Sequence, residues 1–101
     1  MQDNFKALRQ FSCQDKFKLS FGNNALAFIG NFTEESKNSV VGKTLYIPFS
    51  EDHPAFTLII SGASLFGKRD KDSLMVSFLS PEERDIVASY DFSKSMFYVE
   101  R

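Results

Sequence analysis

Apolar residues at the start of the chain recur at every third position. Phe5, Leu8 and Phe11 have this spacing, and Asp3 precedes them as a candidate N-cap. A three-residue spacing behind a capping residue predicts a short amphipathic helix over about residues 4–12. The apolar stripe of this helix is narrow, so we expect the helix to pack on a larger apolar surface and to be integral to the fold.

Further along the chain, apolar residues alternate with polar ones in several short runs. Alternation with a period of two is typical of half-buried strands, and Gly, Asn, Pro or charged residues between the runs predict turns. Because short connections favour antiparallel neighbours, we expect one antiparallel sheet. The runs that predict its strands are 16–21, 25–32, 43–49, 55–67, 73–79, 85–92 and 96–100.

The run at residues 85–92 is also compatible with a helix. Its alternation favours a strand, but the tetrapeptide SPEE, which begins at Ser80, is typical of a helix start. Ser would be the N-cap, Pro would take the first helical position, and the second Glu would complete a capping box. We predict a strand over 85–92 and keep a helix over 81–90 as the alternative.

Glycines within two predicted strands favour a curved sheet. Gly62 divides the apolar run 55–67, and Gly30 lies in the run 25–32. Gly inside a strand often marks a bulge or a sharp bend. The predicted fold is of the α+β class: a curved, half-barrel-like antiparallel sheet of about seven short strands, with one N-terminal helix packed on its concave face.

Composition adds the size and character of the core. The 101 residues suit a single domain, 1–101, and 43% hydrophobic with 25% charged residues is typical of a globular chain. Twelve Phe and no Trp predict a Phe-rich core, and so many aromatic residues also allow one exposed aromatic patch. A net charge of -1 gives no general attraction for nucleic acid or anionic lipid, so we expect neither nucleic acid nor membrane as a partner.

The chain contains one cysteine, Cys13, so no internal disulfide can form. Small secreted domains often need disulfides, and the first eleven residues contain no apolar run long enough for a signal peptide. No run approaches the roughly 20 apolar residues of a membrane span. We therefore predict a cytoplasmic protein in which Cys13 is a small, partly buried apolar residue and not a nucleophile.

The stretch from Gly62 to Arg69 is one residue short of a phosphate-binding loop. It reads GASLFGKR, whereas the pattern G-x-x-x-x-G-K-[ST] needs a hydroxyl group at its last position for Mg²⁺. A strand-like run follows it, so no helix N-terminus is placed to face the phosphates. We predict that the stretch binds no nucleotide and that Lys68, Arg69 and Lys71 are solvated at the tip of a turn.

The remaining reactive residues form no catalytic or metal-binding pattern. His53 is the only histidine and lies far from Cys13 in the sequence, so neither a chelating set nor a triad is indicated. We interpret His53 as a surface residue of a turn. The run GKRDKDSLMVSF does not match the RNA-recognition signature. We therefore predict no catalytic residue, no cofactor and no metal ion.

Acidic residues gather in three predicted turns, where solvation is their simplest role. If two or three of these turns lie on one side of the molecule, they would form an acidic rim that complements a basic partner. Tyrosine tolerates half-exposure, so the tyrosines are candidate anchors at the centre of such a surface. The predicted partner-binding residues are Glu34, Glu35, Glu51, Asp52, Glu82, Glu83, Tyr46, Tyr90 and Tyr98.

These observations favour a non-catalytic protein-binding module over an enzyme. Its most concrete form would be a small intracellular bacterial inhibitor or immunity protein, which neutralises a toxin or nuclease by occupying its surface. The alternative is a small-molecule carrier or an enzyme that uses a Phe-lined cavity in the half-barrel, for which convergent polar groups would be needed.

Overall fold

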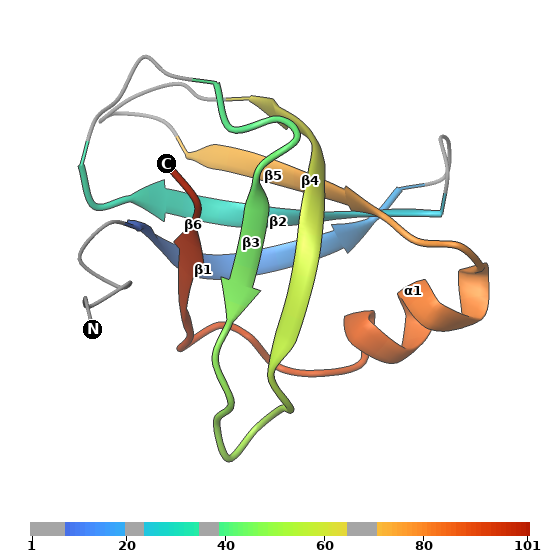
Figure 1. Cartoon of the computed structure of the whole chain (residues 1–101). Coiled ribbons are helices and arrows are strands. Elements are labelled where there is room, and N and C mark those ends of the chain that lie inside the picture. The colour runs from blue at the N-terminus through green and yellow to red at the C-terminus, as the bar shows by residue number, and fades with distance from the viewer. Residues whose placement is uncertain (1–7, 20–23, 35–38, 65–70) are drawn as a thin grey trace, which may run out of the picture.

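The computed structural model describes residues 8–19, 24–34, 39–64 and 71–101 (Figure 1). Most of these residues belong to antiparallel strands, and one short helix lies between the last two strands. The elements are β1 (Arg9–Lys18), β2 (Ala25–Phe32), β3 (Thr44–Ile47), β4 (Phe56–Ser64), β5 (Asp72–Ser77), α1 (Pro81–Ala88) and β6 (Met96–Val99).

The six strands close into a barrel in the order β1-β2-β5-β4-β3-β6, with β6 paired back onto β1. β1 makes this closure possible because it is the longest strand and pairs with β2 on one side and β6 on the other. Figure 1 shows β3 and β4 in front of β1 and β2 and steeply inclined to them. Each described strand therefore has a neighbour on both sides for at least part of its length, although residues 15–18 of β1 pair with β2 alone.

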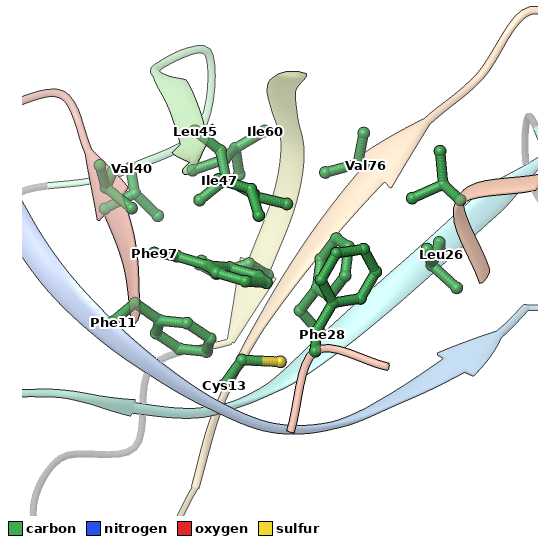
Figure 2. Packing of buried hydrophobic residues seen from close by; sticks show 14 residues of the cluster. Phe11, Cys13, Leu26, Phe28, Val40, Leu45, Ile47, Ile60, Val76 and Phe97 are labelled. Carbon is green, nitrogen blue, oxygen red and sulfur yellow. The ribbon is translucent and has the colours of Figure 1, made fainter. Parts of the chain in front are cut away.

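Alternation along each strand decides which side chains fill the barrel. In β6, Phe97 and Val99 are buried while Tyr98 between them is half-buried. In β3, Leu45 and Ile47 are buried in the same way. Figure 2 shows side chains from the opposite layers of the barrel meeting in one interior. The buried hydrophobic cluster consists of Phe11, Cys13, Leu26, Phe28, Val40, Leu45, Ile47, Ile60, Leu74, Val76, Val87, Phe92, Phe97 and Val99.

Three phenylalanines form the centre of this core. The ring centroids of Phe28, Phe92 and Phe97 lie 5.1–5.7 Å apart, and each pair is close to perpendicular. Edge-to-face contacts of this kind add about 0.5–1.5 kcal/mol to the free energy gained by burying each ring. The expectation of a Phe-rich core is confirmed, and the rings fill the barrel interior by contacting one another.

Two glycines lie at irregularities of the barrel, as the sequence indicates. The register of β1 against β2 shifts just after Cys13, which pairs with Gly30, and the register of β4 against β5 shifts between Ile60 and Gly62. A Cβ atom at Gly30 would collide with the backbone carbonyl oxygen of Ser12. β1 and β2 therefore approach each other closely at the point where β1 bends to meet β6.

The predicted N-terminal helix is wrong. Residues 9–12 belong to β1, and residues 4–7 of the expected helix lie outside the described residues. The spacing of Leu8 and Phe11 fits a helix locally. However, Arg9, Phe11 and Cys13 alternate inward, and backbone pairing with two neighbouring strands overrides the local spacing.

The helix of the structure lies near the C-terminus, where a strand over 85–92 was predicted. α1 begins as the alternative interpretation requires: the Glu83 backbone N–H donates to Ser80 Oγ at 3.1 Å, and Pro81 takes the first helical position. Glu83 Oε2 in turn accepts from the Leu79 backbone N–H at 3.3 Å. The described barrel thus has six strands and not about seven, and it is closed and not a half-barrel.

α1 covers one end of the barrel beyond β1 and β2. Val87 joins the hydrophobic cluster, and Arg84 donates from its guanidinium to the Leu19 carbonyl oxygen at 3.4 Å. Lys18 at the end of β1 and Asp85 form an exposed ion pair at 3.6 Å. Figure 1 shows the helix next to the end of β1, with the chain returning from it to β6.

Substitution of Gly30 by Ala tests whether the close approach of β1 and β2 holds the barrel together. The added methyl group meets rigid backbone, so we expect Gly30→Ala to lower the free energy of unfolding by about 3 kcal/mol. Gly62→Ala is the matched control, because its Cβ meets only the flexible end of Met75, and we expect a loss of about 1 kcal/mol. Urea denaturation measures both, and equal stabilities of the two variants would contradict this packing.

Removal of the Ser80 hydroxyl tests the start of α1. Ser80→Ala leaves the Glu83 N–H without its cap, so we expect a loss of about 1 kcal/mol in the free energy of unfolding. Ser80→Asp retains an acceptor and is expected to restore most of the loss. Thermal unfolding followed by circular dichroism measures both variants, and an unaltered Ser80→Ala protein would show that the cap contributes nothing.

Candidate functional site: an aromatic hollow beside β3 and β6

Two of the predicted tyrosine anchors lie side by side on the outside of the barrel. Tyr46 of β3 and Tyr98 of β6 are directly paired across the two antiparallel strands, and both are half-buried. Directly opposed side chains on antiparallel strands are close enough to contact each other. The alternation that turns Leu45, Ile47, Phe97 and Val99 inward thus turns both phenol rings outward.

A shallow hollow of about 250 Å³ opens next to Tyr98, and we call it the aromatic hollow. It is formed by the chain that leaves β3 and the chain that enters β6. Phe49 is its most prominent side chain, being 76% exposed. The residues that line the hollow are Pro48, Phe49, Ser50, Asp52, Lys94, Ser95, Met96 and Tyr98.

The two loops that form the hollow are joined by a buried histidine. His53 is only 3% exposed, and its Nε2 lies 2.6 Å from Ser95 Oγ. Its Nδ1 lies 2.8 Å from the Pro54 carbonyl oxygen, and its ring packs on Phe92 with the centroids 4.6 Å apart. The interpretation of His53 as a surface residue is therefore wrong. We call the His53–Ser95 contact the loop clasp.

The partners of His53 define its tautomer. A carbonyl oxygen can only accept, so Nδ1–H donates to Pro54, and Nε2 accepts from the Ser95 hydroxyl. A serine activated by an oriented histidine is the arrangement of a nucleophile and its base. However, the His53 ring is buried against Phe92, and the Ser95 backbone N–H already donates to the Phe92 carbonyl. We interpret the pair as a structural clasp.

The three acidic groups lie in different parts of the molecule. Glu51 and Asp52 are exposed in the β3–β4 loop, and Asp52 lines the hollow. Glu82 and Glu83 lie in the first turn of α1. Asp52 lines the hollow together with Tyr98, and Glu51 precedes it in the same loop.

The remaining predicted residues are not part of the hollow lining. Glu34 follows β2 and pairs with Arg101 at 2.5 Å, while Glu35 lies outside the described residues. Tyr90 is half-buried against Phe56 and Phe92, with ring centroids 5.8 and 6.5 Å away, so it supports the core. Phe49, Lys94 and the loop clasp were not predicted as parts of a site from the sequence.

A buried arginine, Arg9, lies at the end of the barrel opposite the hollow, at an inward position of β1. Arg9 is buried with its guanidinium 4.0 Å from the centre of the Phe32 ring, and burial lowers the pKa of Arg9. Asp72 is also buried and accepts from the Phe32 backbone N–H at 3.3 Å. Arginine remains charged despite such a shift, so the apolar interior of the barrel ends at this side in charged side chains, Arg9 and Asp72.

Cys13 is buried inside the barrel, as the sequence predicts. Burial raises the pKa of its thiol from 9.0 to about 12, because the thiolate would lose its hydration. The thiol therefore stays protonated at neutral pH. Within the described ranges, no three His, Cys, Asp or Glu side chains gather as a metal site would require, and no helix is long and apolar enough to cross a membrane.

The phosphate-loop-like stretch falls largely outside the described residues. Gly62 belongs to β4, residues 65–70 are not described, and β5 follows at Asp72 in antiparallel pairing with β4. A comparison of the chain with known protein families, curated proteins and solved structures gives no significant match.

A double-mutant cycle tests the loop clasp. Ser95→Ala leaves His53 Nε2 buried without its donor, so we expect a loss of about 1–3 kcal/mol in the free energy of unfolding. We expect His53→Ala to cost a similar amount or more, and the double variant to cost about 1 kcal/mol less than the sum of the two. Chemical denaturation of all four proteins gives the coupling energy, and strictly additive losses would contradict the clasp.

Thiol labelling tests the burial of Cys13. Because its raised pKa keeps the thiol protonated and the barrel covers it, we expect almost no reaction with iodoacetamide at pH 8 in the folded protein. Unfolding in urea should restore the labelling rate of an ordinary thiol. The same pKa difference makes stability depend on pH. Above pH 9.0 the Cys13 thiol of the unfolded state loses its proton while that of the folded state keeps it, so the free energy of unfolding falls as pH rises toward 12. Rapid labelling of the folded protein would contradict the buried position.

Proposed function

We propose that this protein is a non-catalytic protein-binding module that contacts its partner through the aromatic hollow. The observation that carries the proposal is the 76% exposure of the Phe49 side chain at the edge of a hollow whose two loops are joined by a buried clasp. A large aromatic side chain held in water is unfavourable in the free protein, and burial against a partner would recover about 1.5–3 kcal/mol.

The surroundings of Phe49 suit an interface centre. Pro48, Met96 and Tyr98 provide apolar area around it, and the closed barrel and the clasp hold their backbones in place. Aromatic residues at the centre of an interface commonly provide most of the affinity, and a preorganised surface loses less entropy on binding. This arrangement supports binding without any step of chemistry.

Charges at the rim favour a partner of complementary pattern. Glu51 and Asp52 are exposed on the side of the β3–β4 loop, and Lys94 lines the hollow from the other loop. Such charges act mainly on the rate of association and on the choice of partner. A basic partner, such as the toxin or nuclease of an inhibitor pair in the cytoplasm, would meet the acidic side of the rim; this more specific role stays a prediction.

The alternative of a carrier or enzyme with a Phe-lined cavity gains no support from the core. The rings that would line such a cavity, among them Phe28, Phe92 and Phe97, contact one another at 5.1–5.7 Å. The aromatic hollow lies outside the barrel and is shallow, whereas small-molecule sites usually enclose most of their ligand.

Capture from a native lysate with matched surface variants tests the proposal. Phe49→Ser removes the exposed ring of the hollow, and Leu79→Ser removes a side chain that is 93% exposed before α1. Both side chains are solvated, so neither change should move the melting temperature by more than a few degrees. We expect wild type and Leu79→Ser to retain a stoichiometric protein partner and Phe49→Ser to lose it, with Kd raised about tenfold or more.

Three outcomes would contradict the proposed site. If Phe49→Ser retains the partner with unchanged affinity, the hollow is not part of the interface. Selective loss with Leu79→Ser would move the interface to α1. Absence of any stoichiometric protein partner, together with a small molecule that copurifies, would favour the carrier alternative.

A further inference from the structure

We propose that the aromatic hollow receives an extended, proline-containing segment of the partner, with a basic residue of that segment facing Glu51 and Asp52. This inference rests on the proposed function and specifies the kind of chain that the hollow recognises. It follows from three properties of the described surface: little free strand edge, a short lining with aromatic and proline side chains, and acidic and basic residues on different loops of the rim.

Closure of the barrel disfavours strand addition as the mode of recognition at the hollow. A peptide that adds as a strand needs an exposed row of backbone N–H and C=O groups. β3 is paired with β4 along its length and with β6 at Leu45 and Tyr46, and β6 is paired with β1 along its length, so only a short stretch of strand edge is left at the hollow. We therefore expect the partner to be bound mainly through side chains and isolated polar groups.

The short lining disfavours an amphipathic helix as the occupant. A helix in a groove places apolar anchors along several turns, at positions i, i+3 or i+4, and i+7. The hollow is built from two short segments, 48–52 and 94–98, and its volume is about 250 Å³. This space accepts one or two side chains at a time. An extended segment, whose side chains follow one another along the chain, fits such a space.

The lining matches an extended proline-containing segment in two ways. Proline rings pack on aromatic and proline faces, and Phe49, Pro48 and Tyr98 provide such faces. A polyproline II segment also keeps its carbonyl oxygens unpaired, and Lys94, a lining residue of the hollow, carries an ammonium group that could donate to them. Such a segment is already extended before binding, so it loses little conformational entropy.

The charge at the rim gives the segment a direction. Asp52 lines the hollow and Glu51 precedes it, both carboxylates are exposed, and neither pairs with a basic side chain of the described residues. Lys94 lines the hollow from the other loop and would repel a second cation. A basic residue of the bound segment is therefore favoured on the β3–β4 loop side.

Fluorescence anisotropy with synthetic peptides tests this inference. The probes are labelled peptides of about nine residues, long enough to cross the hollow in polyproline II form, with Pro-Pro-Leu-Pro at the centre and Arg at one end or the other. We expect saturable binding of at least one of the two. Replacement of the prolines by Ala, or of the Arg by Glu, should weaken it about tenfold or more.

Protein variants assign the binding to the hollow. Phe49→Ser and Asp52→Lys should each weaken the peptide about tenfold, and the effect of Asp52→Lys should fade at high salt, whereas Leu79→Ser should bind as wild type does. Equal binding of the proline peptide and its Ala version, or binding that Phe49→Ser leaves intact, would overturn the inference.

The two proposals fail in distinguishable ways. If Phe49→Ser abolishes capture of a protein partner but neither proline peptide binds, the module stands and the extended segment is wrong. If wild type self-associates in sedimentation experiments and Phe49→Ser does not, the occupant is a second copy of this chain, which also overturns the inference.

Discussion

Closure of the sheet through β1 is the constraint on which the rest of the structure depends. β1 can pair with β2 and β6 only because it bends where its register shifts beside Gly30, whose missing side chain lets the Ser12 carbonyl approach. Pairing of β6 with β1 and β3 then brings Tyr98 beside Tyr46 and fixes the chain that enters β6. The hollow exists because this entering chain meets the β3–β4 loop.

Burial and exposure are divided sharply between the two sides of β3 and β6. Inward residues of these strands join a core of edge-to-face Phe rings, while the outward tyrosines and the loop beyond them face solvent. His53 connects the two regions, because its ring packs on Phe92 and its Nε2 accepts from Ser95 at the hollow. Core packing and the shape of the candidate site are therefore linked through one side chain.

Local pattern predicted the strands whose alternation agrees with their final pairing. β2, β3, β4 and β6 lie within the predicted runs, β5 begins one residue before its run, and the glycines marked the irregularities. Residues 9–12 were misassigned because a spacing of three fits one helical face, and only pairing with two distant strands reverses that preference. Residues 85–88 were misassigned because alternation over a short run outweighed a capping box that the structure uses.

The candidate site was predicted less completely, since it is made by contacts between residues distant in the chain. Tyr46, Tyr98 and Asp52 were identified by residue type, but the proximity of Phe49 to Lys94 and the His53–Ser95 contact arise from barrel closure.

The most direct test of the aromatic hollow as the binding site is an NMR titration of the ¹⁵N-labelled protein with the captured partner. If the aromatic hollow is the interface, the shifts will be concentrated at residues 48–53 and 94–98, and α1 will be unaffected. Shifts centred on α1, or absent from both loops, would contradict this assignment of the interface.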